Sequence, residues 1–203
     1  MFRVEWIERH LSRVRPWQVT AVWLPVSAWF LVAGVRHPAL DAGRVARLFV
    51  AGVAVWTLLE YLLHRWVFHF EPRAGSELQQ DLSFLVHGVH HDYPYDADRL
   101  VMPPVVALVI ALAVGFPLHA GLGPRLFPPV FAGLIAGYLW YDLTHYAVHH
   151  LKQRTALGRV QRRNHYLHHF RYPDRLFGVT TPIWDFVFRT NLKVEKGASV
   201  EVQ

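Results

Sequence analysis

Four clusters of histidine constrain the fold of this chain more than any other feature of its sequence. They are the segments HRWVFH, HGVHH, HYAVHH and HYLHH, and hydrophobic sequence separates the second from the third. Neutral imidazole is the commonest protein ligand for iron, zinc and copper. We therefore predict that these ten histidines are metal ligands: His64, His69, His87, His90, His91, His145, His149, His165, His168 and His169.

The spacing within the clusters favours helices that present several imidazoles together. An HxxHH segment places its histidines at i, i+3 and i+4, which share one helical face. The pair His145 and His149 has the same property, whereas His150 points elsewhere on an ideal helix. His64 and His69 are about 140° apart on a straight helix. Either the helix distorts there, or these two residues serve different metals.

Ten histidines are too many for one metal ion. A mononuclear site takes about three or four protein ligands. The sequence therefore predicts a site for two metal ions, and it lacks the bridging Glu-x-x-His pairs of soluble di-iron bundles. Glu60, which precedes His64 in LEYLLH, could orient a ligating histidine or pair with Arg65 at the membrane interface.

Four apolar runs indicate an integral membrane protein. They cover roughly residues 17–35, 45–63, 105–122 and 126–143, and each is near the ~20 residues that cross a bilayer. The last two runs are somewhat short and are predicted to form a hairpin. Between the two pairs of runs, residues 78–91 are predicted to be a helix that carries the second cluster. We expect an all-α membrane protein with about four transmembrane helices in two hairpins and a cytoplasmic helical cap that holds the metals.

Charge supports this topology. With four crossings, all four clusters lie on one side, and that side receives all but four of the 21 Lys and Arg residues. The four exceptions are Arg36, Arg44, Arg47 and Arg125. The positive-inside rule then predicts that the clusters face the cytoplasm. For the same reason we interpret the net charge of +6 as suited to binding anionic lipid headgroups rather than nucleic acid.

The chain is expected to form a single domain over residues 1–203. Residues 1–16 are predicted to be an amphipathic segment on the membrane surface. Residues 191–203 are predicted to be disordered. The apolar segment FGVTTPIWDFVFRT before them is expected to pack over the site or to touch lipid.

The ligand set limits the chemistry. Without Cys, the chain has no thiolate ligand, iron–sulfur cluster or thiol nucleophile. Iron held by histidines at a membrane face could activate O₂ and insert oxygen into a C–H bond of a lipid. Zinc bound by the same histidines could support hydrolysis or a structural role.

The order of the clusters around two hydrophobic hairpins resembles the fatty acid hydroxylase superfamily of membrane dimetal oxygenases. Within it, the chain most resembles the fatty acid 2-hydroxylases, over roughly residues 59–190. The resemblance rests on the blocks EYLLHRWVFH, HGVHHDYPYDADRLVMPP, GYLWYDLTHYAVHH, HYLHHF and FGVTTPIWDFVFRT. It implies that the ten histidines match the family's metal ligands. It also implies that Tyr138, Tyr141 and Asp142 line the substrate path.

The resemblance implies O₂-dependent hydroxylation of a lipid acyl chain, most often at C2, by two metal ions. Iron is expected in the active form, whereas zinc could occupy the same ligands in a purified or crystallised form. A separate electron donor of the cytochrome b5 or ferredoxin type is expected, and the short chain suggests a bacterial inner membrane. Two alternatives remain open at this point. One is another oxygenase of the superfamily that acts on carotenoids or sterols, and the other is a metal-binding membrane protein without catalysis.

Overall fold

The computed structural model describes residues 13–192, and over this range all regular structure is helical. Three helices are long and apolar enough to cross a membrane: α2 (Pro16–Val35), α3 (Ala42–Leu63, continued to Phe68) and α6 (Pro104–His150). The predicted all-α membrane fold is confirmed. The first two apolar runs of the sequence correspond to α2 and α3.

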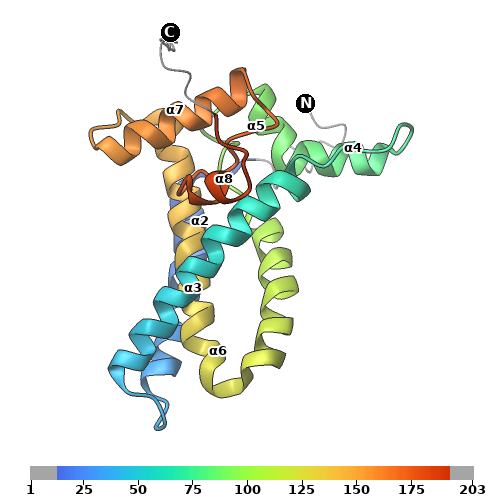
Figure 1. Ribbon diagram of the computed structural model, residues 1–203. Coiled ribbons are helices and arrows are strands. Elements are labelled where there is room, and N and C mark those ends of the chain that lie inside the picture. The colour runs from blue at the N-terminus through green and yellow to red at the C-terminus, as the bar shows by residue number, and fades with distance from the viewer. Residues whose placement is uncertain (1–12, 193–203) are drawn as a thin grey trace.

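Helix α6 is a hairpin. Its backbone leaves the helical conformation at Gly123, where φ is 68° and ψ is 173°, and Pro124 follows directly. A positive φ is readily adopted only by glycine. Figure 1 shows the chain turning back there, so that the two arms of α6 run in opposite directions. The predicted hairpin is confirmed, and its second arm continues as far as His150. The number of crossings and the cytoplasmic side of the clusters stay predictions.

Helix α3 packs against the second arm of α6 at very short range. A Cβ atom at Gly52 would lie 2.0 Å from the carbonyl oxygen of Val130. At Gly133 it would lie 1.9 Å from the carbonyl oxygen of Phe49. Small residues let helix backbones approach closely in membranes, where packing replaces the hydrophobic effect as the driving force. This contact fixes the helices that carry His64, His145 and His149.

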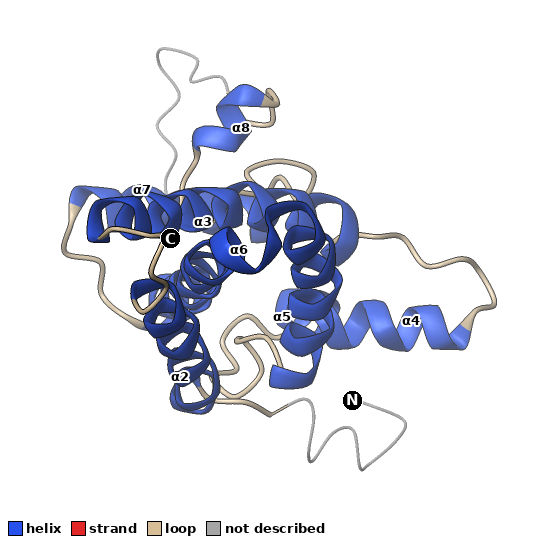
Figure 2. Ribbon diagram, turned by 90° about the horizontal axis from the view of Figure 1, so that it is seen from below, coloured by secondary structure: helices blue, strands red, loops and turns tan. Residues whose placement is uncertain are grey.

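The remaining helices form a cap at one end of the bundle. They are η1 (His64–Phe68) and η2 (Phe84–Gly88), which are π-helical, and α4 (Glu77–Ser83), α5 (Val89–Asp92), α7 (Ala156–Phe170) and α8 (Ile183–Val187). Helix α7 begins at a Thr155 cap, whose hydroxyl accepts the Gly158 amide at 3.0 Å. Figure 1 shows α7 lying across the end of the bundle, above α8 and the end of α6. In Figure 2, α4 projects sideways from the bundle. The predicted helix over residues 78–91 is present, but a π-helical turn interrupts it.

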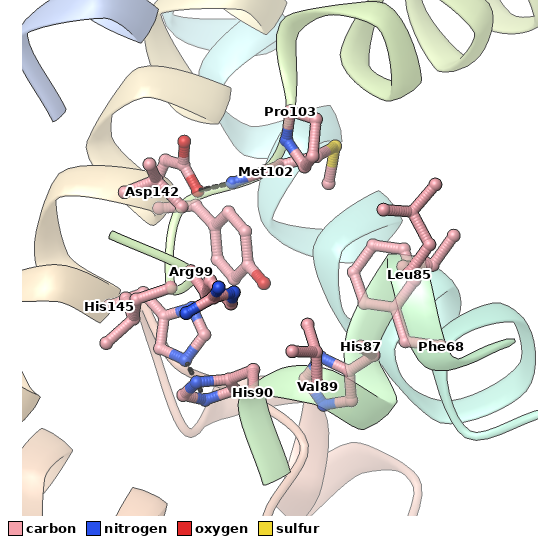
Figure 3. Close-up of a pocket in the computed structure, with 14 residues that line it drawn as sticks. Phe68, Leu85, His87, Val89, His90, Arg99, Met102, Pro103, Asp142 and His145 are labelled. Carbon is pink, nitrogen blue, oxygen red and sulfur yellow. Dashed lines mark hydrogen bonds between the residues drawn. The ribbon is translucent and has the colours of Figure 1, made fainter. Parts of the chain in front are cut away.

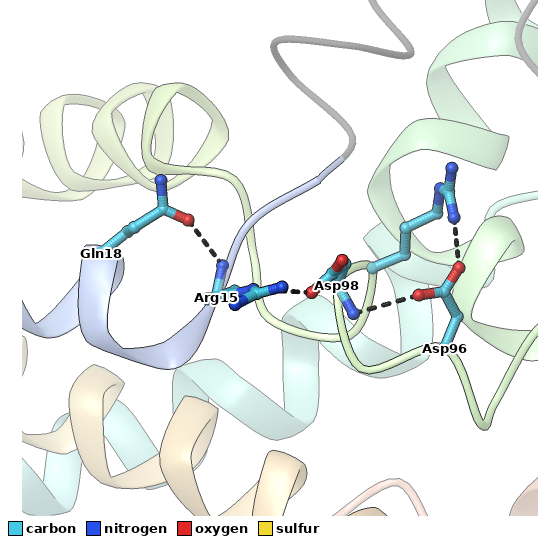
Figure 4. Close-up of polar contacts among 5 residues, drawn as sticks. Arg15, Gln18, Asp96 and Asp98 are labelled. Atoms are coloured by element: carbon cyan, nitrogen blue, oxygen red, sulfur yellow. Dashed lines mark hydrogen bonds and ion pairs between the residues drawn. The ribbon is translucent and has the colours of Figure 1, made fainter.

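The start of α2 is tied to the loop that leads into α6. Arg15 forms an ion pair with Asp98, with Nε and Oδ1 2.9 Å apart (Figure 4). The Val14 amide also donates to the Asp98 carbonyl at 2.7 Å. The Gln18 side chain accepts the Arg15 amide at the first turn of the helix. The predicted surface segment and disordered tail fall almost wholly on residues 1–12 and 193–203, which lie outside the described residues. The single domain stays a prediction.

Candidate metal centre

The ten histidines predicted to bind metal gather in two adjacent groups of five. The first group comprises His64, His69, His87, His91 and His168. The second group comprises His90, His145, His149, His165 and His169. Within each group, one ring nitrogen from every histidine lies within 4.8 Å of the others. The groups meet where the rings of His91 and His169 stack with centroids 4.1 Å apart. His150 belongs to neither group, as the spacing predicts, and its ring lies against Tyr146.

A π-helical turn brings His64 and His69 into the same group. The amide of His69 donates to the carbonyl of His64 at 3.3 Å, an i to i+5 hydrogen bond that widens the helix at its end. Such turns are rare and occur frequently at functional sites. Of the two possibilities left by the sequence, the structure selects a distorted helix. Two histidines that an α-helix would hold apart therefore point to one place.

Each HxxHH segment contributes to both groups. His87 and His91 join the first group while His90 joins the second. In α7, His165 and His169 join the second group while His168 joins the first. The predicted shared helical face is present, but it spans the boundary between the groups. Neither segment alone therefore forms a site.

The ring nitrogens are spaced as metal ligands require. Neighbouring Nε2 atoms lie 2.8 Å apart between His90 and His145, and 2.9 Å apart between His145 and His165. In the first group, Nε2 of His64 and Nε2 of His87 are 3.1 Å apart. Two nitrogens about 2.1 Å from one ion and at right angles would lie about 3 Å apart. The distances in both groups fit this arrangement.

Several buried ring nitrogens have no hydrogen-bond partner among the described residues. They include Nδ1 of His90, His165 and His169, and both nitrogens of His149. Buried polar atoms are almost always paired, and an unpaired one costs about 1–3 kcal/mol. A metal ion bound by His149 would remove part of that cost. The donor set therefore fits two transition-metal ions.

Backbone carbonyls orient two histidines of the first group. Nδ1 of His64 donates to the carbonyl of Phe177 at 2.6 Å, and Nδ1 of His168 donates to the carbonyl of Arg175 at 2.7 Å. Because a carbonyl can only accept, each Nδ1 carries the proton and each Nε2 keeps a free lone pair. Such outer contacts fix the tautomer and ring orientation of metal-binding histidines.

Two buried carboxylates hold the segment that supplies these carbonyls. We call residues 175–181 the strap. Glu60 accepts the amides of Val179 and Thr180, each at 2.7 Å, and also the Thr180 hydroxyl. Asp185 accepts the amides of Phe177 and Gly178, each at 2.9 Å. Glu60 therefore reaches His64 through the strap, without touching a histidine.

The alternative pairing of Glu60 with Arg65 is not formed. Arg65 instead donates to the hydroxyl of Tyr61 at 3.0 Å. The role of the strap carbonyls was not predicted from the sequence. One signal was present, because Asp185 stands within the apolar segment PIWDFVF and a carboxylate there needs partners.

Burial keeps the histidines of the cap uncharged. It lowers the pKa of His69 and His91 to about 4, and that of His168 to about 3. It also lowers the pKa of His87, His90 and His165 well below the usual value. Their imidazoles are therefore neutral near pH 7, which is the form that binds metal.

A small pocket borders both groups (Figure 3). His87 reaches it from the first group, and His90 and His145 reach it from the second. Most of the other lining residues are apolar, among them Leu100 and Met102. Arg99 and Asp142 also line the pocket, whose volume is about 20 Å³. Apart from these two side chains and Tyr141, the wall beside the histidines is apolar.

Tyr138, Tyr141 and Asp142 lie close to this pocket, as the resemblance implies. Tyr141 and Asp142 line it, and the Tyr141 ring is 5.6 Å from that of His145. Asp142 accepts the Met102 amide at 3.1 Å and the Tyr138 hydroxyl at 3.3 Å. Both Asp142 oxygens are thus engaged within the protein. The contacts show Asp142 holding the pocket wall, and binding of substrate by these three residues stays a prediction.

Two apolar cavities continue from the pocket toward the membrane face of the bundle. Met102 lines the pocket and also a second cavity, which Trp23, Tyr138 and Ala111 line with it. Trp23 and Ala111 also line a groove of about 480 Å³ between α2 and the first arm of α6. The groove opens where exposed apolar side chains such as Leu108 face outward. Shared residues therefore link the lipid-facing surface to the histidines.

A protein-family model matches most of the chain. The model of the family described as "Fatty acid hydroxylase" matches residues 49–190. That range includes all ten histidines and the strap.

Similar proteins are named for hydroxylation of acyl chains. The chain is 34% identical over 180 residues to an Arabidopsis thaliana dihydroceramide fatty acyl 2-hydroxylase, covering 89% of this chain and 75% of that one. It is 40% identical over 150 residues to the fatty acid 2-hydroxylase of Mus musculus, covering 73% of this chain and 40% of that one. A solved structure, described as full-length scs7p with only the hydroxylase domain visible, aligns with a TM-score of 0.83. That alignment has 35% identity and covers 93% of this chain and 71% of the other.

Proposed function

The chain belongs to the fatty acid hydroxylase family, and we propose that it is a membrane-bound oxygenase that hydroxylates a lipid acyl chain at C2. The observation that carries this proposal is the pair of five-histidine groups beside a pocket whose other lining side chains are mostly apolar. The names of the similar proteins support both the reaction and the position of the new hydroxyl.

We propose that each group holds one metal ion. The nitrogen spacings, the unpaired nitrogens of His149 and the neutral state of the cap histidines support this assignment. Iron bound there would supply the activation of O₂ that replacement of a C–H bond by C–OH requires. The side that carries the groups is proposed to be cytoplasmic, because most Lys and Arg residues lie there.

The protein's own residues prepare the site. The strap carbonyls hold His64 and His168 with their lone pairs directed inward. Glu60 and Asp185 hold the strap, so the orientation of these two ligands is fixed before any substrate arrives. Apolar side chains such as Leu100 and Met102 keep water away from the histidines that border the pocket.

The acyl chain is proposed to enter from the bilayer. The groove between α2 and the first arm of α6 faces lipid, and its lining is apolar. Trp23 and Ala111 connect it to the second cavity, and Met102 connects that cavity to the metal pocket. We propose that Tyr141 contacts the chain near its reacting carbon and that Asp142 and Tyr138 shape the wall.

The experiment is mass spectrometry of total hydrolysed fatty acids from a host that expresses the chain with iron supplied. The matched host expresses His168→Ala, and a second control expresses His150→Ala, which alters a histidine outside both groups. The expected product is a 2-hydroxy acid that the intact chain and His150→Ala form and His168→Ala does not. Hydroxylation at another carbon would retain an oxygenase but reject the C2 assignment. Product from His168→Ala would reject the metal assignment.

A further inference from the structure

The connection from α6 to α7 and the first turns of α7 form a strongly basic surface. Residues 151–173 contain six Lys and Arg residues and no Asp or Glu. Five of the six define what we call the α7 basic face: Lys152, Arg154, Arg159, Arg162 and Arg163. Among the described residues, none of these five forms an ion pair with a carboxylate. No carboxylate of the described part of the chain therefore neutralises their charge.

This face is hollowed and points away from the bundle. A depression of about 230 Å³ is lined by Lys152, Gln153, Arg159, Arg162, Arg163 and Tyr166. Arg159 and Arg163 are four residues apart, share one side of α7 and are exposed. The opposite side of the helix buries His165 and His168 in the two histidine groups. Because α7 lies across the end of the bundle (Figure 1), its exposed side is turned away from the membrane-spanning helices.

An aromatic side chain joins the α7 basic face to the second histidine group. The guanidinium of Arg162 lies over the ring of Tyr166, 4.9 Å from its centroid, and donates to the Tyr166 hydroxyl at 3.2 Å. The Tyr166 ring in turn stacks beside the ring of His149, with centroids 5.6 Å apart. One residue therefore separates the surface from a proposed metal ligand.

The proposed reaction requires electrons from outside the substrate. One oxygen atom of O₂ enters the C–H bond and the other leaves as water, which consumes two electrons and two protons beyond those of the substrate. A chain without Cys holds no iron–sulfur cluster of its own to store them. A one-electron carrier must therefore deliver them close to the metals.

Resting on the proposed function, we propose that the α7 basic face is the docking surface for an acidic electron-carrier protein, with electrons entering beside Tyr166 and His149. Charge complementarity selects the partner, because a basic surface that forms no ion pair within residues 13–192 attracts an acidic protein and steers its approach. The adjacency of the face to the second histidine group, through Tyr166, favours an electron-carrier protein over lipid.

The test compares two double charge reversals. Arg159→Glu with Arg163→Glu changes the α7 basic face at its exposed side. The matched control, Arg36→Glu with Arg73→Glu, makes the same change in net charge at exposed positions far from α7. Each is expressed in a host in which the intact chain forms the 2-hydroxy acid, so that a carrier of that host supplies the electrons. Absence of product from the intact chain would be a failure of the proposed function, and it is recognised before the variants are compared.

Two electron sources separate docking from catalysis. In cells, the α7 variant is expected to form at most about one tenth of the product that the intact chain forms. The control variant is expected to form as much product as the intact chain. After purification, dithionite with a viologen mediator bypasses docking, and all three proteins are expected to form equal product with equal metal content. In host membranes driven by reduced nicotinamide, the deficit is expected to shrink as ionic strength increases.

Three outcomes would overturn the proposal. The first is wild-type product from the α7 variant in cells. The second is an equal loss with dithionite, which would place the arginines in folding or catalysis. The third is a dependence on lipid, measured with dithionite in phosphatidylcholine nanodiscs. In this outcome, added phosphatidylglycerol is required for the activity of the intact chain and the control variant, and the α7 variant is inactive even when it is present. That result would assign the face to anionic lipid.

Discussion

At the residue scale, the first histidine group depends on contacts behind its ligands. His64 and His168 each donate to a strap carbonyl, and Asp185 holds the strap through the Phe177 and Gly178 amides. In the second group, Nδ1 of His90 and Nδ1 of His165 have no such partner among the described residues. We infer that the two groups differ in how firmly the protein orients their ligands.

Asp185→Asn tests this dependence. The amide group replaces an accepting oxygen with a donor and so opposes one of the strap amides. Loss of an outer contact of this kind typically lowers metal affinity 10–100-fold. Metal analysis during titration with a chelator should show that the metal of the first group is released at a lower chelator concentration than in the unaltered protein. The metal of the second group should be released as in the unaltered protein. Asp174→Asn, at an exposed carboxylate, should release metal as the unaltered protein does. Equal weakening of both metals would contradict the role given to the strap.

The buried histidines also predict the pH dependence of stability in the metal-free protein. Burial lowers the pKa of His91 to about 4 and that of His168 to about 3, whereas an unfolded histidine titrates near 6.5. The unfolded chain therefore binds more protons between these values, so the stabilising contribution is complete above about pH 6.5 and is lost as the pH falls toward 4. Thermal unfolding in detergent with chelator present should show a midpoint that is flat from pH 8 to 7 and falls below pH 6. A midpoint that rises on acidification would contradict the neutral state of these residues.

At the element scale, α3 and α6 work as a pair. One carries ligands of the first group and the other carries ligands of the second, and their spacing is set where Gly52 and Gly133 meet opposing backbone. The distance between the two groups is therefore controlled by packing inside the membrane-spanning part.

Gly133→Ala should separate these helices. The added Cβ would lie 1.9 Å from the Phe49 carbonyl, which the backbone must move to relieve, at a cost of roughly 1–3 kcal/mol. The thermal midpoint in detergent should fall, and metal content should fall with it. Gly121→Ala is the control, because nothing lies within 4 Å of a Cβ there. An unchanged midpoint and metal content for Gly133→Ala would contradict the packing account.

The groove between α2 and the first arm of α6 makes a separate prediction. Ala111 lines both the groove and the cavity behind it, so Ala111→Trp should obstruct the path of an acyl chain. Product formation should fall sharply while metal content stays that of the unaltered protein. Val109→Trp places the same side chain at an exposed position outside the groove lining and should be tolerated. Full activity of Ala111→Trp would show that the chain enters elsewhere.

At the scale of the whole molecule, the sequence predicted the membrane fold, the hairpin of α6 and the ten histidines that the structure brings together. It did not predict how the histidines divide. That division depends on the directions from which α5, α6 and α7 approach, and no spacing within one helix encodes those directions. The His64 and His69 pair was ambiguous because a π-helical turn is decided by tertiary packing.

The strap contacts were also beyond local sequence patterns. Glu60 and Val179 are 119 residues apart, and their hydrogen bond exists only in the folded chain. The sequence left open whether Glu60 supports a histidine or pairs with Arg65, and the structure shows that it reaches His64 through a peptide segment. Long-range partners of buried carboxylates were therefore the main part of the site that required coordinates.

The central claim is that two histidine groups direct oxygen from O₂ into C2 of an acyl chain. The most direct measurement is mass spectrometry of the 2-hydroxy acid formed under ¹⁸O₂ in ordinary water, by the intact chain and by His168→Ala. We predict one ¹⁸O atom in the C2 hydroxyl of the product of the intact chain and no labelled product from His168→Ala. A hydroxyl that carries oxygen from water, or labelled product that persists without His168, would contradict the account.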